Sequence, residues 1–495
     1  MTAYDSLENK FARLSHLSGA EAVLHWDTAV MMPSGGAEAR AGQLATLAVI
    51  QHEFLTAPEM ADLLQAAGEE ALDDWQRANL RQMRRKWRHA AALPTALVEA
   101  RSRAHNACEL LWREAREADD FALLSRPLAE VVALAREAAE VKAEALGCTP
   151  YDALLDQYEG GLTTAAVDRC FDVLEARLPA MIATAIENQE RRPALPLGEG
   201  VDTERQTALS QMLVAAVGLP DAHGRLDVSH HPFTGGVPDD VRLTTRYDEI
   251  DPISALMAAL HEAGHAMYEH NLPQRWRNQP VGRAMGMAVH ESQSLIVEMQ
   301  ASRSQPFVSF LSERMRALWG VDGAAWEAEN LGRIVRRVAR SFIRVDADEL
   351  TYPMHVVLRY RLELALLAGD LAVADLPAAW RDGMQKFIGA APPGDRDGCL
   401  QDVHWPGGDF GYFPTYTLGA VAAAQLMAKA QTDRPEIPDA LASGDFGPLM
   451  DWLKSHVHTR GSYPETLDSL LVEATGRPLD TECFLAHLQQ RYLAD

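Results

Sequence analysis

Basic residues are scarce in this sequence, which has 46 lysines and arginines against 70 aspartates and glutamates. The formal net charge of −24 argues against nucleic acid and anionic lipid as partners, because both are bound through basic surfaces. Long apolar runs are also missing, and none approaches the roughly 18 residues of a membrane span. We therefore expect a soluble protein that binds neither nucleic acid nor membranes.

Cysteine is rare too, and its odd number and wide spacing without a C-x-x-C pair indicate reduced thiols. The N-terminal residues lack the basic and apolar regions of a signal peptide, so we expect a cytoplasmic protein. No linker, charge block or repeat divides the 495 residues. We predict one catalytic domain over 1–495, with a helical lobe to about residue 200 and a sheet and metal-site lobe from about residue 201. The five cysteines are Cys108, Cys148, Cys170, Cys399 and Cys483.

Helical patterns dominate the first 190 residues, where apolar and charged positions alternate at helical spacing. Three long helices are predicted over 73–147, separated near Pro94 and Pro127, and another is predicted over 163–190. After a loop rich in proline and glycine, the alternating runs 225–229 and 241–247 predict two strands of a small sheet. The edge of such a sheet can pair with a peptide backbone, or the strands can form a purely structural hairpin.

The most informative stretch is 261–265, which has the sequence HEAGH and matches the H-E-x-x-H pattern of zinc peptidases. Residues four apart share a helix face, so His261 and His265 can both reach one metal ion. Glu262 lies about 100° further round and suits a general base that activates water. The alternative is two hydrogen-bonded histidines on an ordinary amphipathic helix.

Capping signals predict the ends of the helix that carries this motif. Asp251 can cap its N-terminus and Pro252 fits the first helical position. We predict that the helix runs through His270 and stops at Asn271. A second helix is predicted to begin near Gly286.

The second helix supplies two candidates for a third ligand, His290 and Glu291. The two side chains point about 100° apart, so only one can face the ion. We favour Glu291, because two histidines and one carboxylate leave a coordination position for water. Glu298 lies seven residues further along the same face and is either an acceptor for the second N–H of a ligating histidine or a plain surface glutamate.

Six short motifs occur in a fixed order, and their series resembles that of the carboxypeptidase Taq family of metallopeptidases. They are HPF at 231–233, DVRLTT at 240–245, HEAGH at 261–265, HESQ at 290–293, IRVDAD at 343–348 and GCLQDVHW at 398–405. VLHWD at 23–27 extends the resemblance to nearly the whole chain.

The resemblance implies a mainly α, neurolysin-like fold, with two lobes around a deep groove and a small β-sheet beside the metal helix. It implies His261, His265 and Glu291 as metal ligands and Glu262 as catalytic base. Zinc is the implied ion, with cobalt as an alternative, since such a ligand set does not separate the two sharply. Members of the family are typically homodimers.

A carboxypeptidase must also recognise the free carboxylate at the C-terminus of its substrate, and a guanidinium matches the two oxygens best. Arg344 is the candidate, because it lies in the fifth motif of the series. We expect Asp346 and Asp348 to hold it in place. The alternative is an arginine that only belongs to a structural network with these two aspartates.

The oxyanion of peptide hydrolysis needs a neutral or cationic donor beside the metal. His404, Tyr412 and Tyr416 follow the metal motifs at a spacing similar to that of a His and Tyr pair in angiotensin-converting enzyme. We expect Tyr416 to be the donor and His404 its companion. Tyr412 either binds substrate or only packs, and Trp405 and Phe233 are expected in the core or in the groove wall.

Together these residues predict a zinc carboxypeptidase that releases single residues from peptides with a free C-terminal carboxylate. An oligopeptidase or dipeptidyl carboxypeptidase would use the same metal site. A catalytically inactive helical scaffold is disfavoured by the intact base and ligands. No role is predicted for His231, Asp240 or Arg242.

Overall fold

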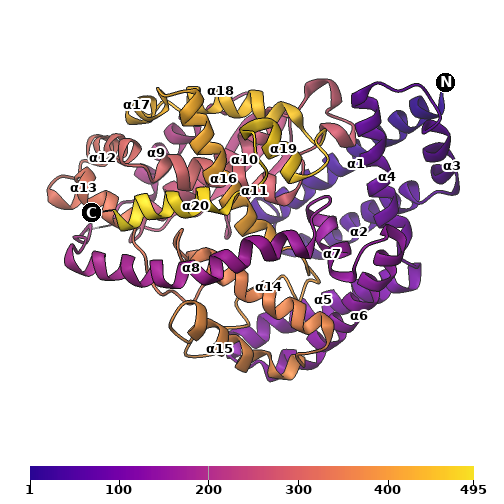
Figure 1. The fold of residues 1–495 in the computed structure, drawn as a ribbon, viewed down its shortest axis with the longest axis horizontal. Coiled ribbons are helices and arrows are strands. Elements are labelled where there is room, and N and C mark those ends of the chain that lie inside the picture. Colours follow the sequence, from indigo (N-terminus) through magenta and orange to yellow (C-terminus); the bar gives the residue numbers. More distant parts are fainter. Residues whose placement is uncertain (199, 495) are drawn as a thin grey trace. The chain divides into compact units, whose positions relative to one another are not determined.

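The computed structural model, which describes residues 1–198 and 200–494, is built mainly from helices and contains one small sheet (Figure 1). This confirms the expected mainly α fold. In this part of the chain, no helix combines the length and the apolar composition that crossing a bilayer requires.

Backbone contacts divide the chain into two compact units, each assembled from three separate segments. Unit 1 consists of 1–90, 194–335 and 422–479, and unit 2 consists of 91–193, 336–421 and 480–494. One segment boundary, at 193/194, lies near the predicted lobe boundary at about residue 200, but each unit also takes segments from other parts of the chain. Helices far apart in sequence pack together within each unit, and local composition does not indicate which distant helices pack together.

Unit 1 holds the sheet and the helix with the H-E-x-x-H motif. Its α-helices are α1 (Ala3–Val30), α2 (Ala37–Leu55), α3 (Pro58–Ala67), α4 (Asp74–Ala92), α9 (Thr203–Val217), α10 (Pro252–His270), α11 (Met287–Leu295), α12 (Gln305–Trp319), α13 (Ala328–Val335), α17 (Ile437–Ala442), α18 (Gly447–His456) and α19 (Leu467–Thr475). Its shorter turns are η1 (Ser34–Gly36), η2 (Gln274–Trp276), η3 (Pro280–Gly282), η4 (Ile296–Ser302), η5 (Ala324–Trp326) and η8 (His458–Arg460).

The sheet has three strands, β1 (Gly224–Val228), β2 (Thr234–Val237) and β3 (Asp240–Thr245), in the order β1-β3-β2. Strands β1 and β3 are parallel and correspond to the two predicted runs, whereas β2 pairs with β3 in antiparallel register. The sequence did not indicate β2, because its Thr-Gly-Gly-Val stretch has no alternating pattern.

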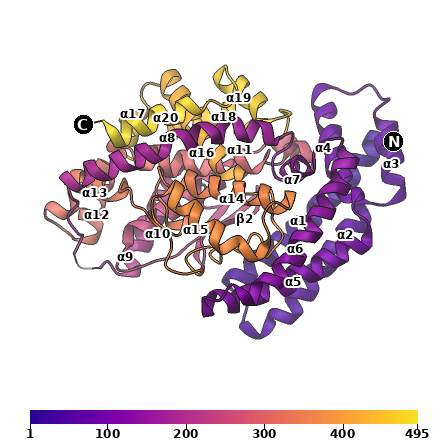
Figure 2. The ribbon, with the colours of Figure 1, turned by 60° about the horizontal axis from the view of Figure 1, so that its bottom comes forward.

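Unit 2 contains α5 (Thr95–Ala118), α6 (Ala122–Leu146), α7 (Pro150–Tyr158), α8 (Thr164–Arg191), η6 (Arg344–Asp346), α14 (Tyr352–Ala368), η7 (Val373–Asp375), α15 (Leu376–Phe387), α20 (Thr481–Leu488) and η9 (Gln489–Leu493), while α16 (Pro414–Asp433) continues from unit 2 into unit 1. Helices α5 and α6 lie side by side in two views (Figures 1 and 2). The predicted break near Pro127 is wrong. The chain turns earlier, at Asp119 with a positive φ of 55°, and Pro127 lies in the second turn of α6, close to its start.

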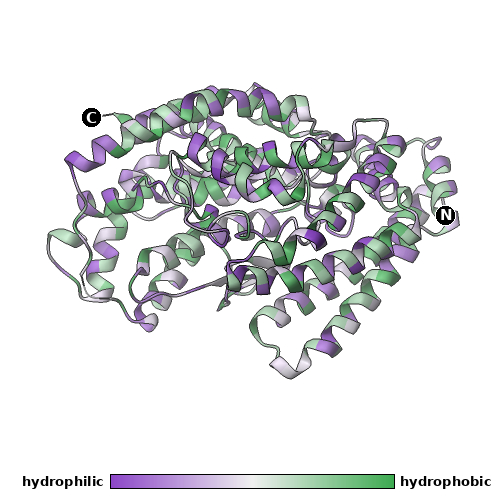
Figure 3. Cartoon of the chain, turned by 90° about the horizontal axis from the view of Figure 1, so that it is seen from below, coloured by the Kyte–Doolittle hydropathy of each residue, from purple (hydrophilic) through white to green (hydrophobic). Residues whose placement is uncertain are grey.

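Most helices are amphipathic, and their ribbons alternate between hydrophobic and hydrophilic residues along their length (Figure 3). In unit 2 the last helices are also held by charge. Glu349 is buried and accepts hydrogen bonds from His487 Nε2 at 2.8 Å and from Arg491 Nη1 at 3.1 Å. Burial raises the pKa of Glu349, but its basic partners outweigh burial and lower that pKa to about 2.

Candidate metal centre and substrate-binding residues

Helix α10 begins and ends where its capping residues predict. The Asp251 side chain accepts a hydrogen bond from the backbone N–H of Ser254, and Asn271 follows the last helical residue. His261 and His265 therefore lie one turn apart, with ring centroids 4.9 Å from each other.

Gly264 lets α11 approach this turn of α10 closely. A Cβ atom at Gly264 would lie 2.3 Å from the carbonyl oxygen of Gln293 and 2.7 Å from the Cα of Ser294. Any other residue in the second variable position of the motif would push the two helices apart. Because α11 begins at Met287, directly after Gly286 as predicted, this contact brings Glu291 to the two histidines.

The side chains of His261, His265 and Glu291 converge. One ligand atom from each lies within 4.8 Å of the others, and His265 Nε2 is 3.6 Å from a carboxylate oxygen of Glu291. His290 turns elsewhere, since its Nε2 is 3.0 Å from Glu269 Oε1. Two imidazoles and one carboxylate at this spacing fit a divalent metal ion and leave room for water in its shell.

Glu298 orients the first histidine. Its Oε2 accepts a hydrogen bond from His261 Nδ1 at 3.0 Å, and its Oε1 accepts one from Arg303 Nη2 at 2.6 Å. A carboxylate at Nδ1 leaves the lone pair of His261 on Nε2, which is the atom available to a metal. Glu298 lies in the π-helical stretch η4. Of the two roles left open by its position beyond Glu291, this contact fits the acceptor and not the plain surface glutamate.

Electrostatics around the histidines favours a cation between them. Burial lowers the pKa of His265 well below its usual value, so its ring is neutral. Burial also acts against protonation of His261, but the hydrogen bond to Glu298 and the neighbouring carboxylates outweigh it and raise its pKa to about 10. These carboxylates would stabilise a metal ion in place of that proton.

Glu262 is buried beside the ligands, with an exposed fraction of 5%. Its Oε2 is 2.7 Å from the hydroxyl of Thr234, the first residue of β2. Burial raises the pKa of Glu262 above its ordinary value, an effect that the nearby His261 partly opposes. Sequence reasoning missed Thr234, although it directly follows the HPF motif at 231–233.

Arg344 lies in unit 2, on the short turn η6, and is buried with 6% exposure. Its Nε and Nη2 donate to Asp402 Oδ1 at 3.1 Å and 2.8 Å, and its Nη1 donates to the Tyr352 hydroxyl at 3.1 Å. Burial acts to lower the pKa of Arg344, but Asp402 outweighs it and the pKa is raised.

The prediction that Asp346 and Asp348 hold Arg344 is wrong. Asp402 takes that place, and Asp348 instead accepts hydrogen bonds from the backbone of Leu350 and Thr351 at the start of α14. A carboxylate so close in sequence closes a turn with its own backbone, just before α14, rather than reaching the guanidinium.

Asp402 also binds a second arginine, because Arg359 Nε donates to its Oδ2 at 2.6 Å. Arg359 is fully buried, so two guanidinium groups share one carboxylate in the interior of unit 2. The trio carries an excess positive charge, which favours an additional anion.

His404 and Tyr416 are neighbours in unit 2, with His404 Nε2 3.3 Å from the Tyr416 hydroxyl. Burial lowers the pKa of His404 to about 4, so its ring is neutral near pH 7. Tyr412 makes edge contacts with Tyr158 and Tyr416, at centroid distances of 4.9 Å and 5.1 Å. The pair predicted to stabilise an oxyanion is thus assembled, with Tyr412 packed beside it.

Comparison with known proteins identifies the family. The profile of the carboxypeptidase Taq (M32) metallopeptidases matches residues 6–492. The chain is 36% identical to thermostable carboxypeptidase 1 of Thermus thermophilus, over 99% of this chain and 98% of that protein. It belongs to the M32 family of metallocarboxypeptidases. Thermostable carboxypeptidase 1 of Pyrococcus furiosus is 34% identical over 98% of this chain and 97% of its own length.

Solved structures agree with this assignment. Metallocarboxypeptidase 1 of Trypanosoma cruzi superposes on the M32 chain with a TM-score of 0.97, at 38% identity and with 99% of each chain covered. The recognised resemblance and the predicted fold class are therefore confirmed. The chain is a hydrolase that acts on peptides, with a His-His-Glu group that can hold a metal ion.

Asp240 and Arg242, which had no predicted role in this M32 chain, join the sheet to α1. Arg242 donates two hydrogen bonds to Asp240, at 2.9 Å and 2.6 Å, and its guanidinium lies 4.6 Å from the ring centroid of Trp26. Arg225 of β1 also lies over Trp26, at 5.0 Å. The HPF residue Phe233 is half-buried, and Trp405 is buried as expected.

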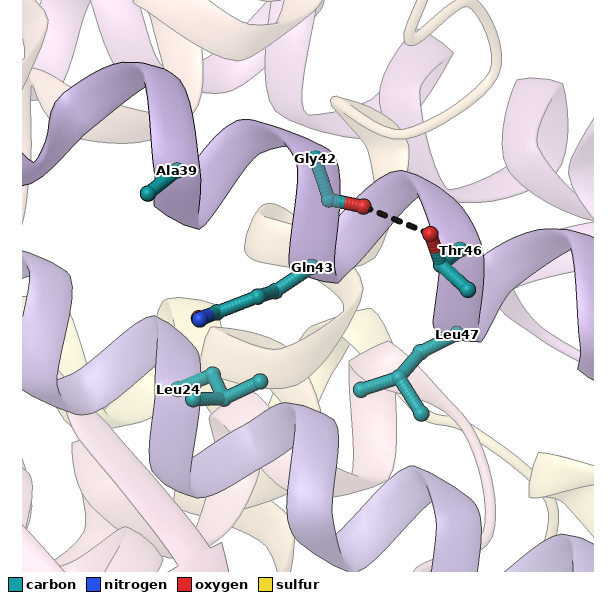
Figure 4. Close-up of a pocket in the computed structure, with 6 residues that line it drawn as sticks. All are labelled: Leu24, Ala39, Gly42, Gln43, Thr46 and Leu47. Carbon is teal, nitrogen blue, oxygen red and sulfur yellow. Dashed lines mark hydrogen bonds between the residues drawn. The ribbon is translucent and has the colours of Figure 1, made fainter.

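A hollow lies between α1 and α2. Its lining is apolar or amidic, and Figure 4 shows the Thr46 hydroxyl turned back to the carbonyl of Gly42, 2.8 Å away. The lining contains no titratable side chain and so offers no acid–base chemistry. It is formed by Leu24, Ala39, Gly42, Gln43, Thr46 and Leu47.

Proposed function

We propose that this M32 peptidase releases single residues from the C-terminus of peptides, with Glu262 as general base. The observation that carries the proposal is the convergence of His261, His265 and Glu291 beside a buried carboxylate whose hydrogen-bond partner is a neutral hydroxyl. Zinc is the ion we expect these ligands to bind, and cobalt would fit the same set.

The reaction needs a group that both takes and gives a proton. A divalent ion held by the three ligands would polarise the scissile carbonyl and make water more acidic. Glu262 accepts a proton from the attacking water and then donates it to the leaving amine. Burial, which raises the pKa of Glu262, brings the carboxyl closer to the balance that both steps require. Thr234 fixes the orientation of its Oε2.

We assign substrate recognition to Arg344, which would bind the free C-terminal carboxylate. The excess positive charge that Arg344 and Arg359 share over Asp402 supports this role. We assign Tyr416 and the neutral His404 to stabilisation of the oxyanion, and Tyr412 to the side of the substrate site. From the family resemblance we further expect a cytoplasmic homodimer.

An oligopeptidase or dipeptidyl carboxypeptidase would use the same metal group. To distinguish these two activities from the proposed carboxypeptidase, the purified protein is incubated with one unblocked peptide, and the products are followed by mass spectrometry. We expect a ladder of single-residue steps from the C-terminus. Internal fragments or two-residue steps would contradict the proposal.

The role of Glu262 is tested by Glu262→Gln. This variant should bind a full complement of metal and lose about 10² to 10⁴ in turnover, because the amide cannot accept the proton. Glu269→Gln is the matched control, since Glu269 lies on the same helix but bonds to His290. Full metal with unchanged turnover in Glu262→Gln would refute the assignment.

A further inference from the structure

A further buried glutamate, Glu363 of α14, lies in unit 2 and has no exposed surface. Its Oε1 accepts a hydrogen bond from Trp405 Nε1 at 2.8 Å. Its Oε2 accepts one from the Tyr151 hydroxyl at 2.6 Å and one from the backbone N–H of Gly411 at 2.9 Å. All three donors are neutral, so this carboxylate has hydrogen bonds in place of a cationic partner.

The three donors tie together parts of unit 2 that carry proposed catalytic groups. Trp405 directly follows His404, and Gly411 directly precedes Tyr412, so Glu363 fixes both ends of the segment 405–411. Tyr151 anchors the same carboxylate to the start of α7.

The segment also lies directly against α7. Gly411 has a positive φ of 86°, and a Cβ there would lie 2.9 Å from the backbone carbonyl carbon of Leu154. At the other end of α7, the Tyr158 hydroxyl donates to Asp409 at 3.1 Å. The backbone conformation of the segment is thus fixed by its contacts with α7 and with Glu363.

We propose that Glu363 is a positioning residue that holds segment 405–411, and thereby sets the placement of His404 and Tyr412 for the reaction. The inference rests on the proposed function, because it assigns these two residues to the chemistry. The hydrogen bonds of Glu363 go to Tyr151, Trp405 and Gly411, so we assign it a positioning role and not a role in the chemistry itself.

The charge state of Glu363 decides how well the segment is held. An ionised carboxylate accepts all three hydrogen bonds, whereas a protonated one presents its own O–H to at least one donor. Burial raises the pKa of Glu363 to about 7, against the three hydrogen bonds, and the nearby Asp409 raises it further. The fully held state therefore forms as pH rises through about 7.

Tyr151→Phe tests the proposal without removing the carboxylate. Losing one hydrogen bond to a charged acceptor disfavours ionisation about tenfold or more, so the rise of kcat/KM with pH should move up by roughly one unit. Tyr360→Phe is the matched control, because Tyr360 is also a buried tyrosine and its hydroxyl donates to Asp168 instead. Its profile should follow the wild type, and metal content should be full in both variants.

Glu363→Gln gives the complementary result. The amide carries a donor where a carboxylate oxygen accepts, so kcat/KM should fall about 10 to 100-fold at every pH, with the step near pH 7 removed. Unchanged kcat/KM in this variant would overturn the proposal. So would equal shifts in Tyr151→Phe and Tyr360→Phe.

A readout independent of activity separates this proposal from the proposed function. In protein labelled with 5-fluorotryptophan, the Trp405 resonance, assigned with Trp405→Phe, should titrate near pH 7 and move upward in Tyr151→Phe. If no peptide is cleaved but this titration appears, the proposed function fails while Glu363 still holds the segment. A Trp405 titration that moves while the kcat/KM profile stays in place would refute the positioning role, and an absent titration would refute the contact itself.

Discussion

Glu298 offers the sharpest test of how this M32 peptidase builds its metal site. The residue is 8% exposed and serves two donors, His261 at 3.0 Å and Arg303 at 2.6 Å. In Glu298→Gln only one amide oxygen remains to accept, and the amide nitrogen faces the other donor. His261 therefore loses either its hydrogen bond or the negative charge that makes its ring a stronger ligand.

Such changes beyond the ligands typically weaken metal binding about 10 to 100-fold, which corresponds to roughly 1.4 to 2.8 kcal/mol. We expect the upper half of that range, because the substitution also leaves Arg303 without its buried counter-charge. The metal Kd is measured at pH 7.5 by competition with a chelator of known affinity, and turnover is measured again at saturating metal. Saturation should restore most of the activity.

Glu269→Gln is the control for this experiment. It makes the same change in a second histidine–glutamate pair, where the histidine is His290 and not a proposed ligand. Its metal Kd should equal that of the wild type. An unchanged Kd in Glu298→Gln, or equal weakening in both variants, would show that the contact between Glu298 and His261 does not tune the metal site.

Three further predictions concern ligation, substrate and stability. Glu291→Ala should lose metal as fully as His261→Ala, while His290→Ala keeps it, as measured by metal analysis of the purified variants; the opposite result for the two neighbours would exclude Glu291 as third ligand. A peptide with a free C-terminus should be cleaved about 10 to 150-fold faster than its C-terminal amide, and Arg344→Lys should lower that ratio. Equal rates for the two peptides in the wild type would show that Arg344 does not bind the C-terminal carboxylate. The pKa of Glu349 is lowered to about 2, so its ionised form stabilises the fold above pH 4.5, and this stabilisation is lost as pH falls from 4.5 towards 2. The difference in Tm between the wild type and Glu349→Gln, measured by calorimetry, should therefore shrink between pH 4.5 and 2; a constant difference would contradict this reasoning.

Local signals in the sequence predicted the parts of the site that depend on one helix or its caps. Asp251 and Asn271 mark the ends of α10, and the four-residue spacing of the histidines needs nothing beyond helical geometry. The choice of Glu291 over its neighbour also followed from helical geometry, together with the need for an open coordination position.

Contacts between distant segments could not be predicted from such local signals. Arg344 is held by Asp402, 58 residues away, rather than by the aspartates of its own motif. The hydroxyl beside Glu262 comes from Thr234 of β2, whose two glycines interrupt the alternation of apolar and polar residues by which a strand is predicted. Each of these depends on tertiary packing, which sequence periodicity does not encode.

The division of the chain has a consequence for its synthesis. Each unit takes three separate segments, and unit 1 needs 422–479 while unit 2 needs 480–494. Neither unit can close on the ribosome while the chain ends before these segments, so folding cannot proceed one unit after the other from the N-terminus. Part of segment 1–90 packs on itself, but its contacts with the last part of unit 1, such as the hydrogen bond from Arg81 to the carbonyl of Tyr463, form only after that part has been synthesised. Contacts of that sequence separation slow folding, which makes this M32 chain a strong candidate for chaperone assistance during its synthesis.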